Sequence, residues 1–188
     1  MRVRSALLTG AAAAAAGAGG YVGLVTGALT VDLAVGRRTR PLGPITVGVD
    51  APRETAYAAA TAPYAQRPTR AMREKVQVLQ RTEHMLLAAH RTPLAGGLTA
   101  TTLETVTFEA PERIGFRLLR GPVPHLTETF TFDERDGVTV LRYQGELGTD
   151  LWTLGERWGT LVARTWEAAV ATSLDQIRVE AERRTTKS

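Results

Sequence analysis

Four polar residues of this sequence fall in phase with large apolar residues on stretches whose alternating pattern is typical of β-strands: Glu104, Arg120, Glu128 and Tyr143. Glu128, for example, shares a predicted strand face with Phe130 and Phe132. Apolar surroundings disfavour the ionised form of a carboxyl group, so such a group can act as an acid or base, or orient a ligand carbonyl. The alternative is that these side chains lie at strand ends, in water or paired with one another. The pattern therefore identifies candidates for a site but no catalytic residue.

Other familiar patterns of catalytic and metal-binding residues are missing from the sequence. There is no cysteine, which excludes disulfides, thiolate metal sites and cysteine nucleophiles. Two of the three histidines, His84 and His90, lie on one predicted strand, about 20 Å apart when extended, and cannot share a metal there. The segment LAGGL lacks the lysine and the helix of a phosphate-binding loop. We expect no metal site and no cofactor.

The charge distribution argues against nucleic acid as a partner. The net charge is +4, but the arginines are scattered and mixed with acidic residues. The short basic groups flank an apolar segment: Arg2 and Arg4 on one side, and Arg37, Arg38 and Arg40 on the other. Basic residues beside an apolar segment are more typical of contacts with a membrane surface than of a DNA-binding stripe.

The apolar segment itself runs from Ser5 to Val31 without a charged residue. As a helix it would be roughly 40 Å long, enough to cross a bilayer. We predict that residues 1–35 form a membrane anchor or signal segment, with residues 5–31 in the membrane. The protein would then be anchored by a single N-terminal helix on an undetermined side. The alternatives are secretion after cleavage near Ala16–Ala18, or a start that is neither anchor nor signal.

Residues 36–44 (GRRTRPLGP) resemble an exposed linker, and the folded domain is expected over residues 45–184. A strand at Ile45–Val49 precedes a helix that ends before Pro63 and a second short helical piece up to Arg73. The period then changes to two, which predicts an antiparallel meander of strands. Its segments begin at Val76, His84, Thr99, Arg113, His125 and Val138, and Asp136–Gly137 is a strong hairpin signal.

The last element is predicted to be one long helix from Leu151 to Arg184. An apolar stripe that includes Leu154, Trp158, Val162 and Trp166 has helical spacing. A helix of this length fits diagonally across a curved sheet. Residues 185–188 are expected to be a disordered tail.

This layout resembles the helix-grip fold of the START-like group, also called SRPBCC or polyketide cyclase/dehydrase-like. The resemblance rests on the opening ITVGVDAPRETAYAAATAP, the hairpin LTETFTFDERDGVTVLRYQGEL, and the terminal helix with Trp158 and Trp166. It implies an α+β fold in which a curved antiparallel sheet of about seven strands surrounds the long C-terminal helix, here preceded by the predicted membrane helix. It also implies a deep cavity between helix and sheet.

Members of this group bind lipids, sterols, polyketides and other apolar ligands, and some catalyse cyclisation or dehydration. The residues expected to contact a ligand are Glu104, Phe108, Phe116, Glu128, Phe130, Tyr143, Trp158 and Val162. The favoured hypothesis is a membrane-tethered carrier or sensor of an apolar small molecule or lipid, without enzymatic activity. The alternatives are a cyclase or dehydratase-like enzyme on an apolar substrate, and a tethered interaction module whose cavity is filled. Fold alone does not decide among them.

Overall fold

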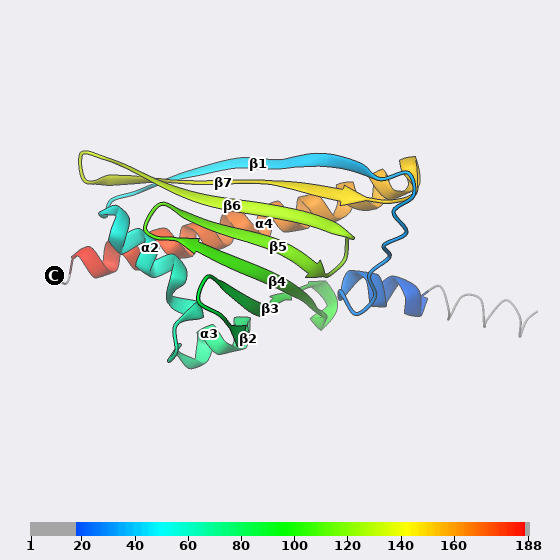
Figure 1. Ribbon diagram of the computed structural model, residues 1–188, viewed down its shortest axis with the longest axis horizontal. Helices are drawn as coiled ribbons and strands as arrows, with labels where there is room; N and C mark the ends of the chain where they lie inside the picture. Colours follow the sequence, from blue (N-terminus) through cyan, green and yellow to red (C-terminus); the bar gives the residue numbers. More distant parts are fainter. Residues whose placement is uncertain (1–17, 187–188) are drawn as a thin grey trace, which may run out of the picture.

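Seven antiparallel strands form one curved sheet with the order β1-β7-β6-β5-β4-β3-β2 in the computed structural model, which describes residues 18–186 (Figure 1). The alternating segments of the sequence form these strands, as predicted. They are β1 (Arg38–Val49), β2 (Val76–Arg81), β3 (Met85–Pro93), β4 (Thr99–Glu109), β5 (Arg113–Arg120), β6 (His125–Arg135) and β7 (Val138–Thr149). The predicted hairpin joins β6 to β7, with Asp136 and Gly137 both at positive φ, as a tight two-residue turn requires.

Short helices connect β1 and β2, which lie at opposite edges of the sheet. They are α2 (Arg53–Thr61), the 3-10 helix η1 (Ala62–Tyr64) and α3 (Arg70–Lys75), with another 3-10 turn, η2 (Ala95–Gly97), between β3 and β4. Helix α2 begins directly after Pro52. Proline suits this place because it lacks the N–H that a helix start leaves unpaired.

The long helix α4 (Trp152–Thr185) crosses the concave side of the sheet (Figure 1), as predicted. Its buried residues include Val162, Val170 and Leu174. The prediction for Leu154 was wrong, because this side chain is 67% exposed. Gly155 and Gly159 face the sheet instead, and a Cβ on Gly155 would lie 1.7 Å from the Asp150 carbonyl oxygen. The start of α4 thus approaches β7 too closely for a large side chain.

The N-terminal segment differs from the predicted membrane helix. Residues 18–25 are helical, but the helix ends there, and the rest of the segment docks on the domain. The Thr101 N–H donates to the Thr26 carbonyl at 2.9 Å, and the Leu151 N–H donates to the Val35 carbonyl at 2.8 Å. Within residues 18–186 no helix is both long and apolar enough for a membrane span. A single helix over residues 5–31 is therefore not supported, and residues 5–17 lie outside the described part.

The predicted linker at 36–44 is wrong from Arg38 onward, because Arg38 to Pro44 belong to β1. Prolines at 41 and 44 suggested an unpaired segment. Strand β1 lies at the edge of the sheet, where a missing N–H leaves no ladder hydrogen bond unmade. The register with β7 shifts between Leu42 and Ile45, which accommodates the second proline. At the other end, α4 reaches Thr185, and residues 187–188 of the predicted tail lie outside the described residues.

Candidate functional site

A cavity of about 850 Å³ lies between α4 and the sheet. Its walls are mainly apolar. Helix α4 contributes Trp158, Val162 and Trp166, while Phe116 and Phe130 come from β5 and β6. The helical end of the N-terminal segment also reaches the cavity, through Tyr21 and Val25, and the Tyr21 ring meets the Trp158 ring edge-on at a centroid distance of 6.3 Å.

Six of the eight expected ligand contacts line this cavity: Glu104, Phe116, Glu128, Phe130, Trp158 and Val162. The other two are placed behind its wall. Phe108 packs against Tyr64 with ring centroids 5.6 Å apart, and Tyr143 is fully buried. Arg120, also considered as an inward residue, is exposed at the end of β5, where the register with β4 shifts.

Glu104 belongs to a first buried polar group on the cavity wall. The Thr102 hydroxyl donates to Glu104 Oε1 at 2.5 Å, and His90 Nδ1 lies 3.1 Å from Glu104 Oε2. The other ring nitrogen, His90 Nε2, is 2.8 Å from the Tyr64 hydroxyl. Burial alone would lower the pKa of His90, but the charge of Glu104 and the hydrogen bond to it outweigh burial and raise the pKa above its ordinary value. Burial raises the pKa of Tyr64.

Glu128 is the centre of a second group. The Trp166 indole N–H donates to Glu128 Oε1 at 2.5 Å, and the buried Tyr143 hydroxyl also interacts with this carboxyl. Burial raises the pKa of Glu128 to about 7, and the charge of Glu104 adds to the increase, while Tyr143, Trp166 and His90 oppose it. A carboxyl with this pKa exchanges its proton near neutral pH, so it can accept, donate or carry charge toward a ligand.

Several residues of these groups were missed from the sequence: Tyr64, His90, Thr102 and Trp166. His90 was considered only as a metal ligand and set aside. A usable signal was its phase with Leu86 and Ala88, both buried on β3. Trp166 was assigned to packing, because its position on the apolar stripe gives no indication of a carboxylate opposite. Tyr64 lies in the 3-10 turn η1, which is too short to show a hydrophobic periodicity in the sequence.

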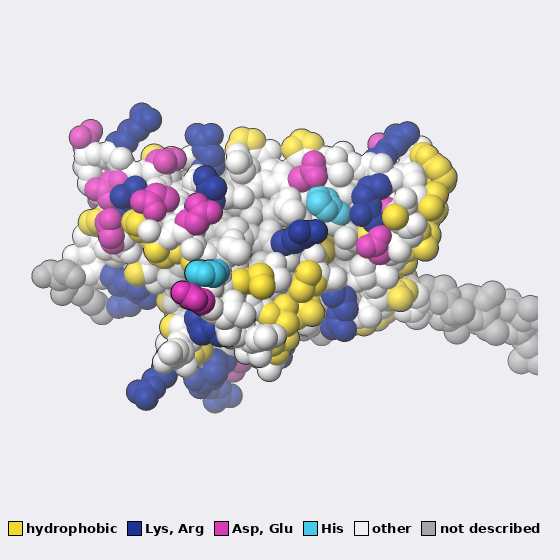
Figure 2. All heavy atoms as spheres, viewed as in Figure 1, with side chains coloured by type: hydrophobic (Ala, Val, Ile, Leu, Met, Phe, Trp, Pro, Cys, Tyr) yellow, Lys and Arg dark blue, Asp and Glu magenta, His cyan; other side chains and the backbone are white. Residues whose placement is uncertain are grey.

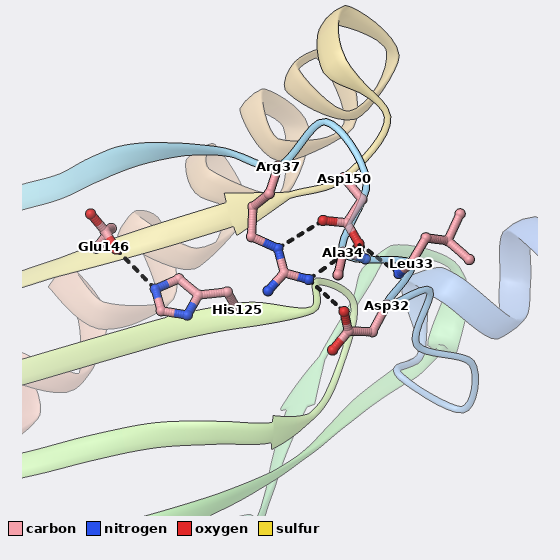
Figure 3. Close-up of polar contacts among 7 residues, drawn as sticks. All are labelled: Asp32, Leu33, Ala34, Arg37, His125, Glu146 and Asp150. Atoms are coloured by element: carbon pink, nitrogen blue, oxygen red, sulfur yellow. Dashed lines mark hydrogen bonds and ion pairs between the residues drawn. The ribbon is translucent and has the colours of Figure 1, made fainter.

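A third acidic residue, Asp150, fixes the N-terminal segment beside the start of α4 (Figure 3). The Leu33 and Ala34 N–H groups donate to Asp150 Oδ2 at 2.7 and 2.9 Å, and Arg37 Nε donates to Oδ1 at 2.7 Å. The bond from Arg37, aided by these two backbone bonds, lowers the pKa of Asp150 to about 2 in spite of burial. Figure 3 also shows the nearby pair of His125 and Glu146, 2.9 Å apart.

Metal chemistry finds no support in the described part of the chain. Within residues 18–186, no group of three or more His, Asp or Glu side chains is placed to hold a metal ion. The absence of a cofactor stays a prediction.

No family model and no curated protein matches this sequence. Solved structures do match its fold. The Zhui aromatase/cyclase from Streptomyces sp. R1128 superposes with a TM-score of 0.63 at 19% identity, covering 79% of this chain and 96% of that one. The chain therefore has a helix-grip fold, as the resemblance implied. Truncated norcoclaurine synthase from Thalictrum flavum gives 0.58 at 10% identity, with 79% and 96% covered.

A third helix-grip structure is the di-domain ARO/CYC StfQ from the steffimycin biosynthetic pathway. Its TM-score is 0.57 at 14% identity, and the match covers 80% of this chain and 52% of that one. At these identities the similarity establishes the fold and leaves the function to the site itself.

Proposed function

We propose that this protein binds an apolar small molecule or lipid in the cavity between α4 and the sheet, as a carrier or sensor. The observation that supports this most directly is the cavity of about 850 Å³ with mainly apolar walls. Ligand pockets commonly have volumes of ~300–1,000 Å³ and combine apolar walls with a few polar groups. Six of the eight residues expected to contact a ligand line this cavity, and a space of this size argues against a filled interaction module.

The direct test is native mass spectrometry of the full chain purified gently from its own host, followed by extraction of any bound compound. Ala169→Trp places a large side chain on the cavity-facing side of α4. Ala168→Trp is the matched control, because Ala168 is exposed and does not line the cavity. We expect wild type and Ala168→Trp to retain a defined apolar compound and Ala169→Trp to lose it. Recovery of no compound from several gentle preparations would contradict the proposal.

A second candidate function is acid–base catalysis on the bound molecule, as in a cyclase or dehydratase. Glu128 favours it, since its pKa of about 7 lets the protonated carboxyl donate to a ligand carbonyl and then recover its proton. Its test compares compounds extracted from wild type and Glu128→Gln. If the protein dehydrates its ligand, the compound from wild type is lighter by one water. Identical compounds in both preparations would favour the carrier.

We also propose that one end of the molecule meets a membrane. Exposed hydrophobic side chains gather where the N-terminal segment and the start of α4 lie side by side (Figure 2). We call this surface the apolar end; it comprises Tyr21, Val22, Leu29, Leu33, Val35, Trp152, Leu154 and Leu161. In the sequence, the stretch from Ser5 to Gly20 that precedes Tyr21 has no charged residue, which supports contact with lipid.

Vesicle flotation of the full chain tests the membrane proposal. Leu154→Gln changes the apolar end, and Val179→Gln is its control, because Val179 is a similarly exposed aliphatic residue near the other end of the same helix. We expect the chain to float with vesicles and Leu154→Gln to float less well than Val179→Gln. A full chain that stays in the dense fraction would contradict the proposal.

A further inference from the structure

The buried charges of the cavity wall do not balance. Glu104 and Glu128 are both buried, and the nearest cationic group, His90, lies 3.1 Å from Glu104. Within residues 18–186, no basic side chain comes within ion-pair distance of Glu128. Its hydrogen-bond donor is the neutral Trp166 indole. When both carboxyls and His90 are charged, the wall has one negative charge without a partner, and that charge is on Glu128.

The groups around Glu128 come from every element that packs near it. They are His90 on β3, Glu104 on β4, Tyr143 on β7, Trp166 on α4 and Tyr64 on η1, and Glu167 on α4 acts on Tyr143. Of these groups only His90 can be positively charged. A buried carboxylate is costly unless it is paired, so ionised Glu128 needs a cation that the protein does not supply at this position.

Aromatic residues lie beside this carboxyl on the cavity wall. Phe116 is the cross-strand partner of Glu128 and its ring lies 5.3 Å from the ring of Phe130, while Trp158 and Trp166 line the same cavity from α4. Ring faces attract cations through their quadrupole, and aromatic surroundings are used to bind organic ammonium groups. One unpaired carboxylate and several aromatic rings form a site for a positively charged nitrogen with an apolar body.

We propose that the ligand of this cavity carries a basic nitrogen that binds against Glu128, with its apolar part on the aromatic wall. This inference rests on the proposed binding function and narrows its ligand class to apolar amines. Three basic residues also line the cavity, and none of them is paired with Glu128. Lys75 donates to Gln176, Arg91 to Gln77 and Arg183 to Glu180.

Three probes of nearly the same shape test the charge preference: 1-naphthylmethylamine, 1-naphthalenemethanol and 1-naphthoate. Binding to the full chain is measured by titration calorimetry at pH 8, where Glu128 is ionised and the amine is protonated. We expect the amine to bind at least ~10-fold more tightly than the alcohol, which corresponds to ~1.4 kcal/mol, and the anion to bind weakest. At pH 5.5 Glu128 is protonated, so the preference for the amine should disappear.

Two variants test whether Glu128 causes the preference for the amine. Glu128→Gln should abolish the preference at pH 8. Glu167→Gln is the matched control, because Glu167 is the next residue to Trp166 but does not line the cavity and accepts from the Gly43 N–H at 2.9 Å. It should keep the preference. If Glu128→Gln fails to fold, the loss of preference between pH 8 and pH 5.5 in wild type remains the test.

The outcomes separate this inference from the function it refines. If the alcohol or the naphthoate binds as tightly as the amine at pH 8, the inference is overturned and binding of apolar molecules stands. A preference that persists in Glu128→Gln also overturns it, because another group then binds the nitrogen. If none of the three probes binds, the inference fails together with the proposed function.

Discussion

Asp150 and Glu128 are both acidic and similarly buried, with 5% and 7% of their surfaces exposed, yet their pKa values move in opposite directions. Asp150 accepts from two backbone N–H groups and a guanidinium, and its pKa falls to about 2. Glu128 has only neutral donors, the Trp166 indole and the Tyr143 hydroxyl, and burial raises its pKa to about 7. The number and charge of the donors outweigh burial at Asp150 but not at Glu128, which separates a carboxylate that fixes the structure from one that is available to a ligand.

The largest expected effect comes from removing the well-satisfied carboxylate. Asp150→Ala leaves two backbone N–H groups without their acceptor and Arg37 without its buried partner, so we expect a loss of about 3–4 kcal/mol in the free energy of unfolding. Urea denaturation at pH 7 measures it. Asp175→Ala, which removes an exposed partner of Arg178 on α4, should change stability little. An equal loss of unfolding free energy in the two variants would mean that the buried contacts of Asp150 stabilise the chain no more than an exposed ion pair does.

A smaller loss of unfolding free energy is expected when only the guanidinium of Arg37 is removed. Arg37→Gln leaves both backbone donors to Asp150 and should cost about 1–2 kcal/mol at pH 7, because Arg37 is partly exposed and its charge is screened. The pKa of Asp150 is lowered from 3.8 to about 2, so this contribution is present above pH 4 and is lost as the pH falls toward 2.

The difference between wild type and Arg37→Gln in urea denaturation should therefore shrink between pH 5 and pH 2.5. Arg38→Gln is the control, since Arg38 forms an exposed pair with Glu156. A difference that stays constant over this range would mean that Arg37 stabilises the chain by packing rather than through Asp150.

Glu128 should respond in the opposite sense. A carboxyl whose pKa is raised from 4.5 to about 7 destabilises the folded state as the pH rises through this interval, because the unfolded chain ionises more easily. Glu128→Gln should therefore stabilise the protein at pH 8, by about 1 kcal/mol after relaxation of the site, and change little at pH 4. Thermal unfolding at the two pH values measures this. Destabilisation at pH 8 would mean that ionised Glu128 is well paired after all.

The comparison also explains how much the sequence could predict. Strand alternation placed Glu128 on the cavity face with Phe130, and the turn at Asp136–Gly137 and the long helix followed from local chemistry. The hydrogen-bond partners of Glu128 and Asp150 could not be predicted from the sequence. Asp150 meets Leu33 and Ala34 across more than one hundred residues, and no local pattern records that contact.

The sequence pattern also did not predict that β1 lies at the edge of the sheet, or that the start of α4 packs closely against its neighbours. The prolines of β1 suggested a linker because their place at the sheet edge depends on the whole topology. Leu154 continued the apolar stripe of α4, but at this point Gly155 and Gly159 pack against the end of β7 and this leucine is exposed. Periodicity predicts which residues share a face, while neighbouring elements decide what that face contacts.

The smallest expected effect comes from removing the Trp166 N–H, and it tests whether hydrogen-bond donors set the difference in pKa between Glu128 and Asp150. Trp166→Phe keeps an aromatic ring and removes the N–H that donates to Glu128, so the pKa of Glu128 should rise further by a fraction of a unit. Carbon-13 NMR of the carboxyl group measures it. Trp158→Phe is the matched control, because the Trp158 N–H donates to the Pro122 carbonyl at 2.7 Å. If the two variants move the pKa equally, burial rather than the missing donors sets Glu128 apart from Asp150.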